Sequence, residues 1–210
     1  MTGTDIDRVF RRKKAEQVIA ALARRNMKGY YCQTGEEARE KVRSLIASGD
    51  TVAWGGSATL DRIGVKPYLP DGLDGLCQPR EKAMEVRKQS FFADVYLTGT
   101  NAITLDGKLV NIDKTGNRTA AMCYGPKKVI VVAGLNKLAQ NEEAALARVR
   151  LEACSANGIR MDKRTPCARA GRCGSCLIPQ ETMCAFTVVT RFSPIEDRIH
   201  VILIGENLGY

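Results

Sequence analysis

At 210 residues with 44% hydrophobic side chains, the chain is long enough to bury a core without disulfide staples. It carries no apolar run as long as a membrane span or a signal peptide, so we expect a cytoplasmic protein with no membrane partner. The formal net charge of +9 favours anionic partners. Nucleic acid is a disfavoured partner, because the densest basic run, residues 11–14, is more simply a solvated helix face, and the arginines near the C-x-x-C motif have no aromatic neighbours.

The N-terminal segment, residues 5–26, has apolar residues at helical spacing, but they fall into two sets on nearly opposite sides of the helix. The two sets are Ile6, Val9 and Phe10, and then Val18, Ile19 and Leu22. Either the helix breaks near Arg12, or its first turns pack on something other than the core. A second copy of the chain is one candidate, which would make the protein a homo-oligomer.

The next part of the chain alternates between strand and helix patterns. We expect strands over 29–32 and 50–54 around a helix over 35–47, and then a helix over 81–92. A strand over 93–100 is followed by a hairpin over 102–113, since its Asp106-Gly107 pair tolerates the positive φ of a tight turn. Strands separated by helices are typical of a parallel sheet.

The last third of the chain continues this α/β pattern. Residues 127–134 form a β-branched run typical of a strand buried on both faces, and residues 138–157 predict a helix ended by Gly158. Strands over 186–190 and 200–205 close the chain. No linker divides it, so we expect one α/β domain over 1–210, with an N-terminal helix and a cysteine-rich insertion, residues 165–185, before the last two strands.

Gly55, Gly56 and Ser57 lie between a predicted strand and a helical start. At such a turn, backbone N–H groups and a helix N-terminus converge on an anion, and the glycines let the backbone approach it closely. The simpler alternative is a tight turn in which Ser57 only caps the helix. The spacing matches neither a Walker loop nor a complete dinucleotide fingerprint, so both interpretations stay open.

A second polar group surrounds the predicted hairpin. It comprises Asn101, Asp106, Asn111, Asp113, Asn117 and Arg118. Loops at the carboxyl ends of strands are where open α/β sheets bind ligands. Asn111 and Asp113 alternate with apolar residues, so both project from one face of a strand, which either lines a site or faces solvent. Turn formation alone accounts for Asp106.

Four cysteines, Cys167, Cys173, Cys176 and Cys184, lie within eighteen residues. The C-x-x-C step lets two thiolates face one metal, although the outer intervals match neither zinc ribbons nor ferredoxins. Few apolar neighbours surround these residues, which argues against a simple core role. We expect zinc or an iron–sulfur cluster here, while a redox dithiol or disulfide, or no special role, remains an alternative.

Four stretches, taken in order, resemble the lactate-utilisation (LUD domain) family. They are VAWGGSATLDRIGV at 52–65, DVYLTGTNAITLDGKLVNID at 94–113, GNRTAAMCYGPKKVIVVAGLNK at 116–137 and TPCARAGRCGSC at 165–176. The resemblance implies a fold like that of ribose-5-phosphate isomerases, CoA transferases and 5-formyltetrahydrofolate cyclo-ligase. It also implies a pocket lined by Gly55, Gly56, Ser57, Gly99, Thr100, Asn101, Asn111, Asp113 and Asn117.

The resemblance further implies a part in L-lactate oxidation, since members of the family occur beside companion subunits that carry iron–sulfur clusters. We therefore expect an anionic metabolite as ligand, with iron–sulfur electron-transfer proteins as partners of an accessory or catalytic subunit. One alternative is a stand-alone isomerase- or ligase-type enzyme acting on a phosphorylated or carboxylated metabolite. A second is a zinc-containing nucleic-acid-binding or regulatory module. The sequence assigns no catalytic residue.

Overall fold

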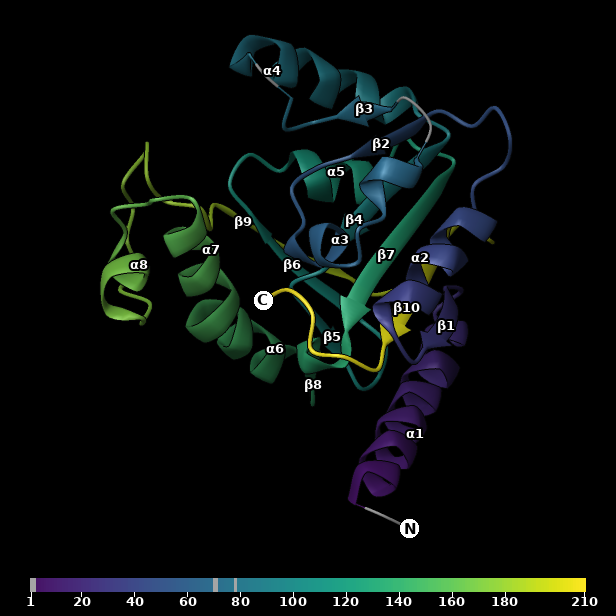
Figure 1. The fold of residues 1–210 in the computed structure, drawn as a ribbon. Helices are drawn as coiled ribbons and strands as arrows, with labels where there is room; N and C mark the ends of the chain where they lie inside the picture. Colours follow the sequence, from purple (N-terminus) through teal and green to yellow (C-terminus); the bar gives the residue numbers. More distant parts are fainter. Residues whose placement is uncertain (1–2, 70–71, 78) are drawn as a thin grey trace.

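A six-stranded sheet forms the centre of the molecule in the computed structural model, which describes residues 3–69, 72–77 and 79–210 (Figure 1). Its order is β1-β10-β7-β4-β2-β3, and every neighbouring pair is parallel. The strands are β1 (Lys28–Cys32), β2 (Val52–Trp54), β3 (Leu73–Asp74), β4 (Val95–Gly99), β7 (Lys128–Gly134) and β10 (Ile199–Ile204). The predicted α/β class with a mostly parallel sheet is confirmed.

A second sheet of four strands has the order β8-β5-β6-β9. Its strands are β5 (Ala102–Thr104), β6 (Leu109–Asp113), β8 (Leu138–Ala139) and β9 (Phe186–Thr190). The predicted hairpin is the antiparallel pair β5–β6, and Gly107 in its turn has a φ of 87°. A side chain at this position would also clash with the backbone of Ala21, so both the backbone conformation and the lack of space require glycine.

Helices cover both sheets (Figure 1). They are α1 (Gly3–Ala23), α2 (Gly35–Ser44), α3 (Ala58–Arg62), α4 (Arg80–Gln89), α5 (Asn117–Cys123), α6 (Glu142–Arg148), α7 (Cys154–Arg160) and α8 (Pro166–Ala170). A π-helical turn, Val149–Ala153, joins α6 to α7. No helix in the described ranges is long and apolar enough to cross a membrane.

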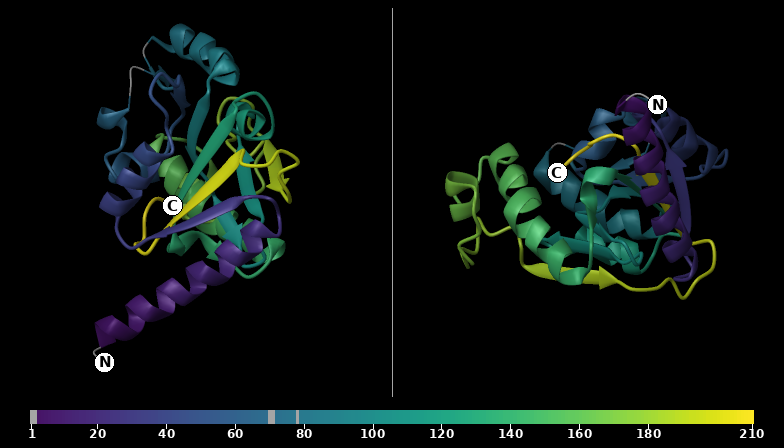
Figure 2. Two further views of the ribbon diagram at one scale, coloured as in Figure 1. Left: turned by 90° about the vertical axis from the view of Figure 1, so that its right-hand side faces the viewer. Right: turned by 90° about the horizontal axis from the view of Figure 1, so that it is seen from below.

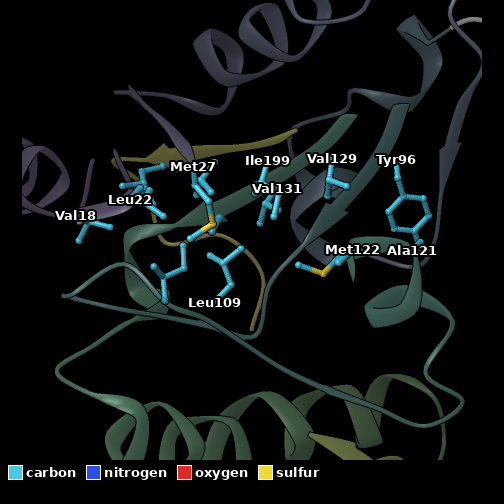
Figure 3. Packing of buried hydrophobic residues seen from close by; sticks show 14 of the residues in the cluster. Val18, Leu22, Met27, Tyr96, Leu109, Ala121, Met122, Val129, Val131 and Ile199 are labelled. Carbon is cyan, nitrogen blue, oxygen red and sulfur yellow. The ribbon is translucent and has the colours of Figure 1, made fainter. Parts of the chain in front are cut away.

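Three apolar cores hold these layers together. The first lies between one face of the large sheet and α1, α5 and the second sheet, and its members include Leu22, Leu109, Met122, Val129 and Val131 (Figure 3). The second packs α2 and α3 against the opposite face, and the third packs α6 and the π-helical turn on the second sheet. Because successive residues of β7 enter different cores, this strand is buried on both sides, as its sequence predicts.

Helix α1 is continuous, so the break considered near Arg12 does not occur. Its last turns pack on β1, whereas its first turns extend away from the body of the molecule (Figure 2). Ile6 and Phe10 are each 55% exposed there. A second copy of the chain covering this end stays a prediction.

The prediction of a helix over 138–157 is wrong at both boundaries. Residues 138 and 139 form β8, and the helical segment begins at Glu142. The helical segment continues through Gly158 and ends at Arg160. Gly158 lies where α7 packs against α8, since a Cβ at this position would lie 3.1 Å from the Cβ of Ala168. The glycine permits close helix packing rather than ending the helix.

Arg198 fixes the end of α5 and gives a test of the fold. This buried side chain donates hydrogen bonds to the carbonyls of Ala121, Met122 and Pro126 at 3.1, 2.6 and 3.0 Å. Arg198→Met should lower the free energy of unfolding by about 2–3 kcal/mol, because buried carbonyls lose charged donors. Urea unfolding checks this, with exposed Arg24→Met as a control expected to change it by less than about 0.5 kcal/mol. Equal effects of the two substitutions would contradict this anchoring role.

Candidate functional site

A cavity of about 190 Å³ opens at the carboxyl edge of the large sheet. The segments that follow β2, β4, β7 and β10 all contribute to its lining, because parallel strands end at the same edge. The end of β6 supplies Ile112 and Asp113, and α7 forms an outer wall. Segments more than 150 residues apart in the chain therefore meet around one small volume.

Six of the nine residues predicted to line a pocket do line this cavity. They are Gly56, Ser57, Gly99, Thr100, Asn101 and Asp113. Gly99 is tightly enclosed, since a Cβ there would lie 2.9 Å from Ser57 Oγ and 3.8 Å from Lys137 Nζ. The absence of a side chain at Gly99 thus keeps the space beside Ser57 and Lys137 open.

Gly55, Asn111 and Asn117 lie outside the lining. Asn111 is only 1% exposed, and its Oδ1 accepts a hydrogen bond from the Asn101 backbone N–H at 3.3 Å. Asn117 begins α5 and accepts a hydrogen bond from Thr115 Oγ1 at 2.7 Å. Both asparagines support the neighbouring turns.

Ser57 serves as the N-cap of α3, where its Oγ accepts a hydrogen bond from the Leu60 backbone N–H at 3.4 Å. The capping interpretation of this serine is therefore correct, and the same residue also borders the cavity. Since α3 has only five residues, its dipole is a weak source of anion binding. The positive charge of the site must come from side chains.

An ion pair between Arg118 and Asp113 frames one side of the cavity. Arg118 Nε and Nη2 lie 2.9 and 2.6 Å from Asp113 Oδ1, and Nη2 also donates to Asn101 Oδ1 at 2.7 Å. The other carboxylate oxygen accepts a hydrogen bond from the Thr119 backbone N–H at 2.9 Å. Asp113 is thus fully engaged in holding Arg118 against the β4–β5 turn, and both residues border the cavity.

Lys137 is the most unusual residue of the site, and we did not predict it. Its side chain is buried, and Nζ donates hydrogen bonds to Thr59 Oγ1 at 3.0 Å and to the Thr100 carbonyl at 3.1 Å. No carboxylate forms an ion pair with it in the described part of the chain. Burial, reinforced by Arg148, Arg118 and Arg62, lowers the pKa of Lys137 to about 7.

A sequence signal for Lys137 does exist. The residue follows the β-branched strand β7 by three positions, and the carboxyl ends of such strands carry ligand sites. It is also the last residue of the third stretch that resembles the LUD family. Nothing in the sequence alone, however, distinguishes a buried lysine from the many exposed ones.

Two further cations line the outer part of the cavity. Lys114 Nζ donates to the Gln180 carbonyl at 2.6 Å, and Arg160 donates to Asn157 Oδ1 at 2.7 Å. With Lys137 and Arg118, four basic side chains border the cavity against one carboxylate, Asp113, which Arg118 already neutralises. The excess positive charge favours an anionic ligand.

The last residues of the chain, Gly209 and Tyr210, line the cavity. The backbone N–H of Leu208 donates to Asn136 Oδ1 at 3.1 Å. Gly209 has a φ of 73°, and a Cβ there would clash with Thr59 Oγ1 and lie 3.0 Å from Lys137 Nζ. Glycine is needed at this position for both conformation and space.

The four cysteines predicted to bind metal lie on α8 and in the segment that follows it, and α8 packs beside α7 (Figure 1). Cys167 is buried in α8, Cys176 is half-buried, and Cys173 and Cys184 are exposed. Within the described residues, no three Cys, His, Asp or Glu side chains stand close enough to hold one ion. The eight cysteines include no disulfide.

Comparison with known proteins gives the family. The sequence model of the LUD domain matches residues 15–204, so the chain belongs to the LUD domain family, which is associated with lactate utilisation. Among solved structures, a DUF162 family protein from Deinococcus radiodurans aligns with a TM-score of 0.55 and 13% identity, over 92% of this chain and 98% of that one. At this identity the likeness shows the fold alone. A search of curated proteins found no match.

The buried lysine makes a prediction about stability and pH. Lys137 has a pKa of about 7 when folded and about 10.5 when unfolded, so between these values the unfolded chain binds more protons. Stability should therefore rise with pH across this window, with a slope of up to about 1.4 kcal/mol per unit, and the gain should be lost progressively as pH falls from about 10.5 to about 7. The Lys137→Met protein should lack this rise of stability with pH.

Urea unfolding of the parent protein and Lys137→Met at pH 7, 8 and 9, under reducing conditions, measures how the free energy of unfolding depends on pH. Other titrating groups, including the cysteines, are common to the two proteins and cancel in the difference between them. Parallel pH profiles would show that Lys137 is not held in the low-dielectric environment described here.

Proposed function

We propose that this cavity binds a small anionic metabolite, and that the protein takes part in the oxidation of lactate or a related organic acid. One observation carries the proposal: Lys137 is buried at the cavity without a carboxylate partner in the described part of the chain. A buried, unpaired ammonium group is unfavourable by several kcal/mol in real proteins. A bound anion would compensate it directly.

The size and lining of the cavity support a small ligand. The cavity volume is about 190 Å³. This suits a metabolite of a few heavy atoms, such as a short hydroxy acid, a short oxo acid or a phosphate. Arg118 and Lys137 offer the charge for a carboxylate or phosphate, while Thr100 and Asn101 offer polar groups beside it.

The family supports the choice of organic acid. Its association with lactate utilisation makes lactate and its oxidised form the first candidates among small carboxylates. Oxidising such an acid requires an electron acceptor, and we infer that an iron–sulfur protein fills this role in the cytoplasm. The net charge of +9 suits an acidic electron carrier.

A stand-alone isomerase- or ligase-type enzyme is the second candidate, with a fold like that of ribose-5-phosphate isomerases, CoA transferases and 5-formyltetrahydrofolate cyclo-ligase. It is favoured by the pKa of Lys137, because a lysine that titrates near 7 can act as a general acid or base at physiological pH. Turnover of a phosphorylated or carboxylated metabolite without any partner protein would support this alternative. A zinc-containing nucleic-acid-binding module has less support, since the cavity suits a small ligand.

Calorimetric titration with lactate, pyruvate and inorganic phosphate tests the binding site. Lys137→Met should weaken the binding of whichever anion binds by at least about tenfold, equal to about 1.4 kcal/mol, because the buried cation is lost. Lys88→Met is the matched control: Lys88 is exposed on α4, paired with Glu85, and outside the cavity lining. The Lys88→Met variant should bind the anion as tightly as the parent protein does.

Binding that is equally strong in both variants would place the anion elsewhere. Failure of all three probes with the folded parent protein at millimolar concentration would contradict the choice of a small carboxylate or phosphate.

A further inference from the structure

Besides the cavity, the structure gathers a second set of reactive side chains near α8, which packs beside α7. Cys167, Cys173, Cys176 and Cys184 lie on α8 and the loop that follows it. Burial raises the pKa of the Cys184 thiol, and the neighbouring thiols of Cys176, Cys173 and Cys167 raise it further. Cys184 thus lies in the same part of the fold as the other three cysteines, although Cys167 and Cys184 are 17 positions apart in the chain.

Backbone geometry directs the C-x-x-C turn toward Cys167. A Cβ at Gly174 would lie 2.9 Å from the Cβ of Pro166, so the turn packs directly on the first residue of α8. Ser175 has a φ of 49°, in the left-handed region that non-glycine residues seldom adopt. Strained backbone of this kind clusters at binding sites, where another contribution compensates its cost.

Three of the four sulfur atoms already have polar neighbours. Cys173 Sγ accepts a hydrogen bond from the Ser175 backbone N–H at 3.5 Å. Thr165 Oγ1 lies 3.2 Å from Cys167 Sγ, and Thr182 Oγ1 lies 3.5 Å from Cys176 Sγ. A backbone N–H that donates to a thiolate, as that of Ser175 does to Cys173, is a usual outer-shell contact of a metal site and stabilises the negative charge on sulfur.

The loop between Cys176 and Cys184 folds back on itself. Thr182 Oγ1 accepts a hydrogen bond from the Ile178 backbone N–H at 2.8 Å and donates one to the Cys176 carbonyl at 3.2 Å. Glu181 Oε2 accepts a hydrogen bond from the Arg164 backbone N–H at 2.8 Å, which attaches the loop to the segment before α8. These contacts return the chain toward the C-x-x-C turn and α8, so that Cys184 lies in the same part of the fold as the other three cysteines.

We propose that Cys167, Cys173, Cys176 and Cys184 bind a thiophilic metal centre, either a zinc ion or an iron–sulfur cluster. Four thiolates with no histidine are the ligand set that both centres take. The arginines within the segment, Arg169 and Arg172, offset the negative charge of four thiolates. Since no three of the thiols converge on one point in this structure, metal binding must draw the exposed Cys173 and Cys184 inward.

Cys154 is a fifth thiol nearby and serves as the control. It lies at the start of α7, outside the 165–185 segment, and burial raises its pKa to about 12. The thiols of Cys184, Cys167 and Cys173 contribute to that increase, so Cys154 shares their surroundings. Four ligands complete a zinc or cluster site, so the proposal leaves Cys154 uncoordinated.

The centre would also affect the cavity. Met183, which precedes Cys184, and Asn157, which follows Cys154 by three positions on α7, both belong to the cavity lining. Metal binding would fix the loop that carries Met183 and so stabilise the outer wall. Metal binding at these cysteines does not depend on the proposed function, because none of the four belongs to the cavity lining.

The test is to purify the full chain without oxygen, supply iron and sulfide or zinc, and measure metal content and the visible spectrum. The parent protein should retain stoichiometric metal after desalting. Each single substitution, Cys167→Ser, Cys173→Ser, Cys176→Ser or Cys184→Ser, should reduce it at least about fivefold, because a hydroxyl is a poor ligand for soft metals. Cys154→Ser and Cys32→Ser should retain it, and far-UV circular dichroism shows which variants are folded.

Cobalt(II) titration of the parent protein gives a readout that needs no variant, because thiolate ligation produces strong charge-transfer absorption. A brown chromophore with bound iron identifies a cluster, and a colourless protein with one zinc per chain identifies a zinc site; both support the proposal. Four freely titrating thiols without metal, or a disulfide between Cys173 and Cys176, would overturn it. Equal metal loss in Cys154→Ser would overturn the assignment of these four ligands.

Discussion

The candidate site depends on one constraint, the parallel alignment of β2, β4, β7 and β10. Parallel strands all end at the same edge of a sheet, so the segments after them must meet there. In this chain those segments carry Ser57, Thr100, Lys137 and Gly209. The two cores on either side of the sheet fix the strands, and the second sheet then places Asp113 beside the same edge. The cavity is thus a consequence of topology, and its chemistry depends on which residues the topology brings there.

The electrostatics of the site divide its cations into two kinds. Arg118 has a carboxylate partner in Asp113, so its charge is balanced and its position is fixed. Lys137 has only a hydroxyl and a carbonyl as hydrogen-bond acceptors, and neither balances a charge. A fold that needed only stability would be better served by an apolar residue at this position. The unbalanced lysine therefore points to a ligand.

Most of the fold could be predicted from the sequence because its signals are local. The β-branched run of β7, the Asp106-Gly107 turn and the helix–strand alternation each depend on residues close together in the chain. The prediction that Gly158 ends its helix was wrong, because the role of this glycine depends on α8, which packs against it. The sequence could not decide whether α1 is continuous, since a continuous helix with an exposed apolar stripe and a broken helix have the same pattern of apolar residues.

The site was predictable only in part, for a related reason. Ser57, Thr100 and Asp113 could be found because turns after predicted strands are natural candidates for ligand binding. Lys137 and Arg160 could not be found in this way, because their place at the cavity depends on burial and on the position of α7. Asn111 is the opposite case: its alternation with apolar residues suggested a polar face, but the side chain is buried against the β4–β5 turn.

The central claim is that Lys137 is a buried amine that acquires its charge balance from a bound anion. Nuclear magnetic resonance of the ¹⁵N-labelled Lys137 side chain, assigned by comparison with Lys137→Met, measures its pKa directly. Without ligand the pKa should be about 7, and a saturating anion at the cavity should raise it by about one unit or more, because a nearby negative charge favours the ammonium form. A pKa near 10.5 without ligand, or one that the bound anion leaves unchanged, would contradict the account.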